Sequence, residues 1–572
     1  PVYRVSFCLF ILFFTFILYF IGFQIFSPLY FQNHVIITYG LHPFDICIEQ
    51  PILWKYLKIL FLITYLYSSI FFSNLLYNLF NFKKFKRTKK NNSKPSLTNL
   101  NKKEDLSLLI GENANTRELI YLPEKSLYQN ILITGTIGTG KTSSAMYPFT
   151  KQLIKYKNCN KEKKLGMLIL DVKGNYYKKV LEFASDFNRL DDIIVIELNG
   201  NYKYNPLHKP NLKPSVIANR LKTILLLFSK NNSESYWIDK ASQILEEAIK
   251  LCRLYNNNYV TFIELHKLIT EKNYYLEKVG LLRKKFIKNK FSKKQVYDLF
   301  SSLNFFENEY FNLDHRTSSI LQSEITRITN CFISDYDVLK TFCPTKEELN
   351  FLGFDEVINN GKIVVLNMNI NEYSYLSKII AAYLKLDFQT DVMTRLANTS
   401  NNNFRSVCFI SDEYSEYCTE TDCNFFSQSR EAKCINIVAT QSYTSLLNTL
   451  HDQSSVNVII QNLINKLWFR NDDIFTIENA QKQIGKEDKE KVSRGISENA
   501  KETVFSYFTN SLNSKNSSIS ESITTNIQNE YIYDTNFFTR NLTNFHCLGF
   551  LSTGSEIIPP TEIKLYPYFY IK

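Results

Sequence analysis

The feature that most constrains the fold of this chain is a glycine-rich stretch, residues 135–142, which reads GTIGTGKT. It matches the pattern GxxxxGK[ST], follows the apolar run NILIT (130–134) and precedes SSAMYPFTKQLI, which has helical spacing of its apolar residues. A strand, loop and helix in this order present backbone N–H groups and a helix amino terminus to a phosphate. We therefore predict an ATP-binding loop formed by Gly135, Thr136, Ile137, Gly138, Thr139, Gly140, Lys141, Thr142 and Ser143.

Two side chains of this loop have distinct expected roles. Lys141 would bridge the β- and γ-phosphates, which makes it a predicted catalytic residue, and the hydroxyl of Thr142 would bind Mg²⁺. The alternative is a glycine-rich turn that binds no nucleotide. The preceding strand, the lysine and the threonine together argue against that alternative.

A second apolar run, SVCFISDE at residues 406–413, ends in two adjacent acids. Hydrolysis of a bound nucleotide requires carboxylates beside the metal and the attacking water. We predict that Asp412 belongs to the Mg²⁺ shell and that Glu413 polarises water as the general base. Because acids often end strands, this prediction depends on the phosphate loop upstream.

Further polar residues lie near later strands. The run INIVATQ (435–441) ends in Gln441, and RecA-like motors place a γ-phosphate sensor at this position. Just before that run, SQSREAK contains Arg430, which we predict to be an arginine finger for a neighbouring subunit's nucleotide. The alternative for Arg430 is an ordinary surface arginine. Arg470, which ends NKLWFR, is a weaker candidate.

Apolar runs and amphipathic stretches alternate from about residue 106, which predicts an α/β domain. Between about 211 and 345, apolar residues recur at helical spacing instead. We predict an all-α domain (211–345) inserted between two parts of the nucleotide-binding domain (106–210 and 346–572). The runs expected to be buried parallel strands span residues 130–134, 166–171, 192–198, 362–368, 406–413, 435–441 and 465–470.

Two polar stretches interrupt this pattern. Residues 283–294 (RKKFIKNKFSKK) are basic and are a candidate contact for nucleic acid, although a solvated helix face or loop fits their composition better. Residues 508–526 are rich in Ser and Asn, and we predict a surface loop there.

The amino-terminal part contains two long apolar segments without charges, at about 5–26 and 59–82. Each is long enough to cross a bilayer as a helix, and the first lacks the cleavage pattern of a signal peptide. A basic run, KKFKRTKK, follows the second, within a polar linker at 83–105. The positive-inside rule then predicts a multi-pass protein of the cell (cytoplasmic) membrane, with a two-helix anchor (1–82) and with both termini and the ATPase domain in the cytoplasm.

Composition excludes few function classes. The formal net charge of +12 includes the juxtamembrane lysines, so it does not by itself indicate nucleic-acid binding. The 11 cysteines form no repeated CxxC pair, and no His/Cys cluster has the spacing of a zinc finger. We expect buried or free thiols in a reducing compartment.

The order of these motifs resembles the type IV secretion coupling proteins, the TraG/TraD group of conjugative DNA-transfer ATPases. The resemblance extends over nearly the whole chain and continues through YNPL (204–207), SYWIDKA (235–241), GKIVVLNM (361–368) and SREAKCINIVATQS (429–442). The family commonly has Asp-Pro-Lys-Gly-Glu where this chain reads Asp171-Val-Lys173-Gly-Asn175. Because Asn175 replaces the family's glutamate, no role of that acid is carried over to this chain.

The resemblance implies a RecA-like P-loop domain with an inserted all-α domain, assembled as a homo-hexamer at the membrane. It also implies that Arg430 acts between subunits and that the all-α domain helps to recognise a DNA–relaxase complex. The expected function is ATP-driven transfer of single-stranded DNA, with its attached relaxase, to the components of a type IV secretion channel. The alternatives are a nucleotide-switched docking receptor for secreted proteins and an FtsK/HerA-like DNA translocase.

Overall fold

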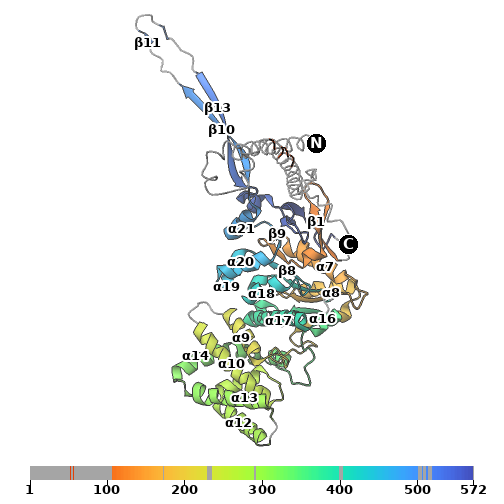
Figure 1. Cartoon of the computed structure of the whole chain (residues 1–572), viewed down its shortest axis with the longest axis vertical. Helices are drawn as coiled ribbons and strands as arrows, with labels where there is room; N and C mark the ends of the chain where they lie inside the picture. Colours follow the sequence, from red (N-terminus) through yellow and green to blue (C-terminus); the bar gives the residue numbers. More distant parts are fainter. Residues whose placement is uncertain are drawn as a thin grey trace. The chain divides into compact units, whose positions relative to one another are not determined.

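The structure, a computed structural model, describes residues 106–570 except 172, 228–234, 289–290, 399–403, 500–504, 507–510 and 513–517, together with Ile52, Tyr56, Ile59 and Ile63. The chain forms two compact units, Pro1–Ser96 and Leu97–Lys572. The second unit contains all of the strands and helices named below (Figure 1).

The centre of the second unit is an eleven-stranded sheet in the order β2-β1-β15-β14-β9-β3-β8-β7-β4-β6-β5, counted over the described residues. The strands from β9 to β5 pair in parallel, and those from β2 to β14 add an antiparallel edge. The strands are β1 (Ser107–Asn113), β2 (Leu119–Pro123), β3 (Ile131–Thr134), β4 (Gly166–Leu170), β5 (Ile193–Glu197), β6 (Ile363–Asn367), β7 (Val407–Ser411), β8 (Cys434–Thr440), β9 (Asn465–Trp468), β14 (His546–Phe550) and β15 (Thr561–Lys564). The prediction of an α/β fold with a large parallel sheet is confirmed, and every run expected to be a parallel strand is one.

The parallel strands are apolar at almost every position because both faces of the sheet are covered. In β3, Ile131 and Ile133 belong to one hydrophobic core and Leu132 belongs to another, as expected for side chains that alternate between the two faces of a strand. Helices α7 (Tyr147–Lys155) and α8 (Tyr176–Asp186) contribute to the first core, and α17 (Ile370–Asn398) contributes to the second. Helices therefore cover both faces of the parallel part of the sheet.

Between β5 and β6 the described residues form helices, turns and an isolated β-bridge that joins Tyr204 to Phe351, and Figure 1 shows most of these helices, yellow to green, grouped together. The helix α17, which follows β6, contacts both α9 of this group and β4 of the sheet. The helices of the group are α9 (Pro214–Leu227), α10 (Ser235–Tyr255), α11 (Phe262–Thr270), α12 (Lys272–Ile287), α13 (Lys293–Asn304), α14 (His315–Ile333) and α15 (Tyr336–Phe342), whereas α16 (Asp355–Asn360) packs against β4 of the sheet. The remaining helices are α6 (Glu124–Leu127), α18 (Thr421–Gln428), α19 (Tyr443–Leu450), α20 (Gln453–Asn462) and α21 (Ile474–Ile484).

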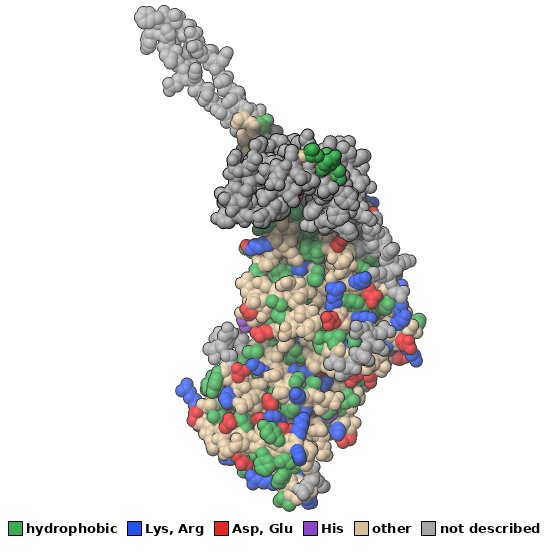
Figure 2. Space-filling model, in the orientation of Figure 1, with side chains coloured by type: hydrophobic (Ala, Val, Ile, Leu, Met, Phe, Trp, Pro, Cys, Tyr) green, Lys and Arg blue, Asp and Glu red, His purple; other side chains and the backbone are tan. Residues whose placement is uncertain are grey.

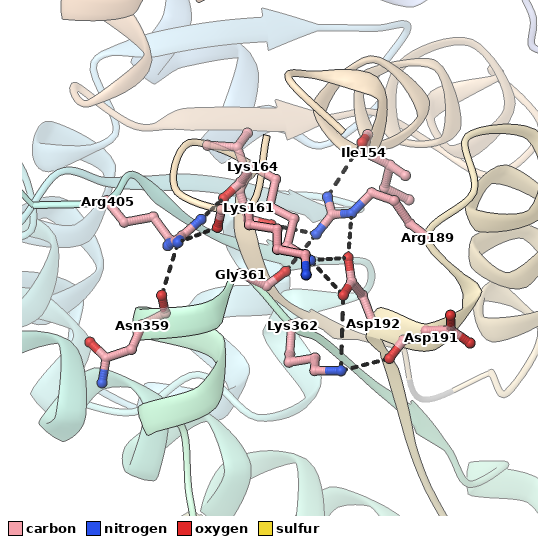
Figure 3. A network of polar contacts seen from close by, with 11 residues as sticks. Ile154, Lys161, Lys164, Arg189, Asp191, Asp192, Asn359, Gly361, Lys362 and Arg405 are labelled. Carbon is pink, nitrogen blue, oxygen red and sulfur yellow. Dashed lines mark hydrogen bonds and ion pairs between the residues drawn. The ribbon is translucent and has the colours of Figure 1, made fainter. Parts of the chain in front are cut away.

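A buried arginine joins the amino ends of the parallel strands (Figure 3). The guanidinium of Arg189 donates to the carbonyls of Leu165 at 2.9 Å and Gly361 at 2.5 Å, which lie one residue before β4 and two residues before β6. Its Nε also donates to Asp192 at 2.9 Å, and Lys164 donates to the same carboxylate. Because carbonyls at the starts of strands lack sheet partners, this arginine satisfies groups that would otherwise be buried without a hydrogen bond. The network lies at the amino ends of the parallel strands, whereas the phosphate loop lies at their carboxyl ends. We therefore assign the network a structural role.

The loop predicted for residues 508–526 is corrected for the part that the structure describes, whereas 508–510 and 513–517 lie outside the described residues. Two strands, β10 (Lys486–Asn499) and β13 (Ser518–Tyr531), pair antiparallel over their whole length, and β11 (Phe505–Ser506) pairs with β12 (Ser511–Leu512). The composition suggested a loop because Ser and Asn dominate it. Ile and Thr recur through 518–531, and these β-branched residues favour a strand once a partner is available.

The predicted membrane localisation is also corrected. No helix in the part of the chain that the structure describes is both long enough and apolar enough to cross a bilayer. Helix α17 has 29 residues, but Lys385 and Asp387 interrupt its apolar sequence. The segments 5–26 and 59–82 lie outside the described residues, apart from Ile59 and Ile63. Neither of the two predicted transmembrane helices is therefore found in the described part of the chain.

Candidate functional site: a phosphate-binding loop at the carboxyl ends of the parallel strands

The glycine-rich loop connects β3 to a π-helical turn, Lys141–Met146, which continues as α7. Gly138 and Gly140 have φ values of +80° and +95°, a left-handed conformation that side chains disfavour. A Cβ on Gly140 would lie 2.5 Å from the ring of Phe545. The loop therefore needs glycine for its backbone and, at residue 140, for close packing.

The ammonium of Lys141 lies over this loop. It donates hydrogen bonds to the carbonyl oxygens of Gly135 and, at 3.1 Å, of Thr136, and the residue is only 8% exposed. Burial lowers the pKa of Lys141, and the negative charges of Glu413 and Asp412 act in the opposite direction. The loop thus holds a desolvated cation at its centre, as an anionic ligand requires.

Strand β7 brings the predicted carboxylates to the same place. The hydroxyl of Thr142 donates to Asp412 Oδ2 at 2.9 Å. The next residue, Glu413, adopts a left-handed backbone conformation with φ of +50° and ψ of +45°. That conformation is costly for a residue with a side chain and tends to persist where function requires it.

Asp412 lies among acids. Burial and, to a lesser extent, the neighbouring carboxylates of Asp171 and Glu413 raise the pKa of Asp412 to about 6, although Lys173 and the hydroxyl of Thr142 act in the opposite direction. A cluster of buried acids beside a threonine hydroxyl has the oxygen donors that Mg²⁺ prefers. Binding of a divalent cation would remove the repulsion that raises this pKa.

Strand β8 lies between β3 and β7, so its carboxyl end lies between the loop and the acids. Gln441, which follows β8, donates from Nε2 to Glu413 at 3.4 Å, and its carbonyl oxygen accepts from the N–H of Gly135 at 3.2 Å. The side chain of Gln441 therefore contacts Glu413, the predicted general base, while its backbone contacts the loop. Arg470, after β9, lies beside the same loop, where its carbonyl oxygen accepts from the N–H of Thr136 at 2.9 Å.

Two residues of this site were not among the predicted site residues. Asp171, at the end of β4, accepts from the backbone N–H groups of Lys173 at 2.9 Å and Asn175 at 3.1 Å. Lys173 forms an ion pair with Glu413, and although its partial burial lowers its pKa, the hydrogen bond and charge of Glu413 raise it more. The signal was present in the sequence, because DVKGN follows a predicted strand, but only the strand order places β4 next to β7.

Arg430 is not brought together with these residues. It is exposed and lies between α18 and β8, at the amino end of that strand. The loop and the acids lie at the carboxyl ends of the same parallel strands. An arginine at the opposite edge of the sheet does not complete the site of its own chain.

The carboxy-terminal segment covers one side of the loop. The N–H of Phe545 donates to the carbonyl of Thr139 at 3.1 Å, and the N–H of Tyr568 donates to the carbonyl of Ser143 at 2.9 Å. Tyr568 also packs edge-on against Tyr147 of α7, with ring centroids 5.3 Å apart. The sequence alone predicts no role for this segment.

These residues fit a nucleoside triphosphate with Mg²⁺. The loop offers backbone N–H groups and a buried lysine to the phosphates, and Thr142 and Asp412 offer oxygen ligands to the metal. Ile137 and Gly138 at the tip of the loop are exposed, so a ligand has access. The fold and the loop together are those of a P-loop NTPase.

Comparison with solved structures shows which proteins share this fold. The chain is similar to the bacterial conjugative coupling protein TrwBdeltaN70 in its unbound monoclinic form, with 13% identity, a TM-score of 0.54, and coverage of 82% of this chain and 90% of that chain. It is similar at 13% identity to TrwB in complex with the ATP analogue ADPNP (TM-score 0.53; 82% and 91% covered), and at 12% to TrwB in complex with ADP and Mg²⁺ (0.52; 81% and 93%). No family model and no curated protein matches this chain. The predicted resemblance to coupling proteins is confirmed at the level of the fold.

Proposed function

We propose that this chain is an ATPase that couples ATP hydrolysis to the transfer of single-stranded DNA, with an attached relaxase, to a type IV secretion channel. The single observation that supports ATP hydrolysis is that the carboxyl ends of three strands lie next to one another. The ends of β3, β8 and β7 bring Lys141, Gln441 and Glu413 to one place, with Thr142 and Asp412 in hydrogen-bond contact beside them.

In this proposal each residue of the site has one role. The loop from Gly135 to Ser143 binds the phosphates, and the ammonium of Lys141 turns from the loop carbonyls to the β- and γ-phosphates. Thr142 and Asp412 would hold Mg²⁺, which when bound would supply positive charge beside the phosphate oxygens. Glu413 leaves Lys173 to accept a proton from the attacking water, and Gln441 responds to the γ-phosphate.

The proposal that this chain transfers DNA rests on other observations than the proposal that it hydrolyses ATP. The support for DNA transfer is the order of sequence motifs and the fold shared with a conjugative coupling protein. On the face seen in Figure 2, basic and acidic side chains are interspersed, so no single basic patch marks a path for DNA there. Within the basic stretch 283–294, Arg283 pairs with Glu307 and Lys285 donates to the carbonyl of Tyr255, which favours a structural role for both. We propose residues 211–345 as an all-α domain for substrate recognition, inserted between nucleotide-binding parts 106–210 and 346–572.

The function is tested by the effect of DNA on ATP turnover by the full chain. We expect single-stranded DNA of any sequence to raise turnover several-fold, with a stimulation that weakens as salt rises, because the contacts are to phosphates. Phosphate release is measured with and without a mixed-sequence oligonucleotide at 50 and 200 mM salt. Turnover that DNA does not change would remove the DNA-motor proposal and favour the docking receptor.

We further propose that the active form is a ring-shaped homo-hexamer. In this ring, Arg430 of one subunit reaches the nucleotide bound by its neighbour. Its exposure, and its distance from its own loop across the sheet, suit a residue that acts in trans. We expect Arg430→Ala to lower turnover by about 10³-fold, the usual effect of losing an arginine finger. Mixing the Arg430→Ala chain with a Lys141→Ala chain should restore part of the activity, since some interfaces then carry both residues.

The control for this mixing experiment is Lys433→Ala, a cation in the same turn, which should keep its turnover. If no mixing ratio restores activity, Arg430 does not act between subunits.

A further inference from the structure

The carboxy-terminal segment places a group of aromatic side chains beside the phosphate loop. Phe545 packs on Gly140, and the backbone of Tyr568 bonds to Ser143, as described above. The next two residues, Phe569 and Tyr570, have 55% and 73% of their surface exposed. Their ring centroids are 4.8 Å apart with the ring planes inclined by 55°, and Phe569 also lies edge-on to the ring of Tyr568 at 5.4 Å.

We propose that Phe569 and Tyr570 form an aromatic platform for the base of the bound nucleotide, in which one ring stacks on the face of the base and the other, inclined by 55°, contacts its edge. This inference rests on the proposed function, since it requires a triphosphate in the loop, and it adds the part of the site that binds the base. The platform would favour purines over pyrimidines through their larger ring surface. It would discriminate little between adenine and guanine, because contacts with aromatic rings do not read the hydrogen-bonding groups that distinguish the two.

The direction of the bound nucleotide supports this placement. Glu413 and Asp412 mark where the γ-phosphate and the metal lie, next to Thr142. The α-phosphate of a linear triphosphate lies at the other end of the cradle, and the ribose and base continue away from the acids. The backbone contacts to Thr139 and Ser143 place the carboxy-terminal segment against the loop, within reach of a base that leaves it.

The hydrogen bonds that fix the carboxy-terminal segment also support its role as a binding surface. Hydrogen bonds join Leu565 N–H to Phe545 O at 2.8 Å and Tyr570 N–H to Pro567 O at 2.9 Å. The segment is thus attached to the loop at one end and turned at the other. The ring of Tyr568 is occupied, edge-on against Tyr147 and 4.7 Å from the ammonium of Lys179, so it supports the platform and is not free to stack. Phe569 and Tyr570 are left facing solvent, although exposing two adjacent aromatic rings is unfavourable without a ligand.

The test compares ATP with inorganic triphosphate, which has the phosphates but no base. In the full chain, Phe569→Ala/Tyr570→Ala should weaken ATP binding about tenfold, the loss of roughly 1.4 kcal/mol of stacking. Binding of inorganic triphosphate should not change, because the loop is intact. The preference for ATP over CTP should fall towards one. Calorimetric titration of each ligand measures these affinities directly and does not depend on turnover.

Matched variants separate the possible outcomes. Phe569→Trp should keep ATP affinity, since Trp also stacks, and Tyr297→Ala/Tyr336→Ala, which removes two exposed tyrosines from α13 and α15, should change nothing. Unchanged ATP affinity in the Phe569/Tyr570 variant, or an equal loss for ATP and inorganic triphosphate, would overturn the platform. A change in assembly mass with an unaltered ATP-to-triphosphate ratio would instead make these rings a contact with a second copy and would also overturn it. If Lys141→Ala leaves both ligands bound as tightly as before, it is the proposed function that fails.

Discussion

Replacing Lys141 with Ala should abolish ATP turnover, lowering it by two to three orders of magnitude or more. The ammonium is desolvated over the loop and positioned to neutralise charge on the β- and γ-phosphates, and no other described cation contacts the loop carbonyls of Gly135 and Thr136. Binding of ATP should weaken as well, since Lys141 contacts the ground state and the transition state alike. Phosphate release and calorimetric titration of ATP measure the two effects.

Two further variants make this result specific. Glu413→Gln should bind ATP at least as tightly as the wild type but fail to hydrolyse it, because the amide keeps the shape of the side chain and cannot take a proton. Lys151→Ala, in α7, removes an ammonium that pairs with Asp186 at 3.1 Å on the outer surface, and turnover should not change. Normal turnover by Lys141→Ala with an intact thermal transition would refute the hydrolytic site.

Replacing Asp387 with Asn should destabilise the fold by about 3–5 kcal/mol. The carboxylate lies in α17 with no exposed surface and pairs with Lys209 at 2.7 Å and with Arg220, while Tyr204 donates to it as well. Burial raises the pKa of Asp387, but the two cations outweigh burial and bring the pKa below its ordinary value. An amide in its place leaves two buried cations without a counter-charge.

The position of this cluster explains why the effect should be large. Lys209 and Tyr204 belong to the chain after β5, Arg220 belongs to α9, and Asp387 belongs to α17, so one carboxylate joins the helical group to the helix that covers the sheet. The shift in urea midpoint measures the loss. Because the pKa of Asp387 is lowered by folding, its contribution is present above the ordinary carboxyl pKa and is lost as pH falls through the folded value. The difference between wild type and variant should therefore shrink in acid.

Asp391→Asn, one turn along α17, is the matched control. Burial and the charge of Asp387 raise the pKa of Asp391, and its Oδ2 accepts from the N–H of Phe354 at 3.1 Å, a bond that an amide oxygen also makes. Its neutral replacement should cost less than about 1 kcal/mol. Equal losses for the two variants would show that the charge of Asp387 is not what stabilises this region.

Much of the fold could be predicted because its signals are local. A run such as GMLIL is buried on both faces in any parallel sheet, and the loop at 135–142 requires a strand before it and a helix after it. The antiparallel strands β1, β2, β14 and β15 were missed because their alternating, partly exposed residues resemble amphipathic loops. The hairpin of β10 and β13 was missed because its strand character depends on a partner about 30 residues away along the chain.

The sequence by itself determined the chemistry that each segment carries: glycines and a lysine for phosphate, two acids after a strand, and apolar strands for a covered sheet. Only the tertiary structure decided which of these groups meet. The order β3-β8-β7-β4 sets Gln441 between the loop and the acids, pairs Lys173 with Glu413, and leaves Arg430 at the opposite edge. The reason is physical: residue type and spacing act over one or two turns of chain, whereas strand order is set by how both faces of the whole sheet are covered.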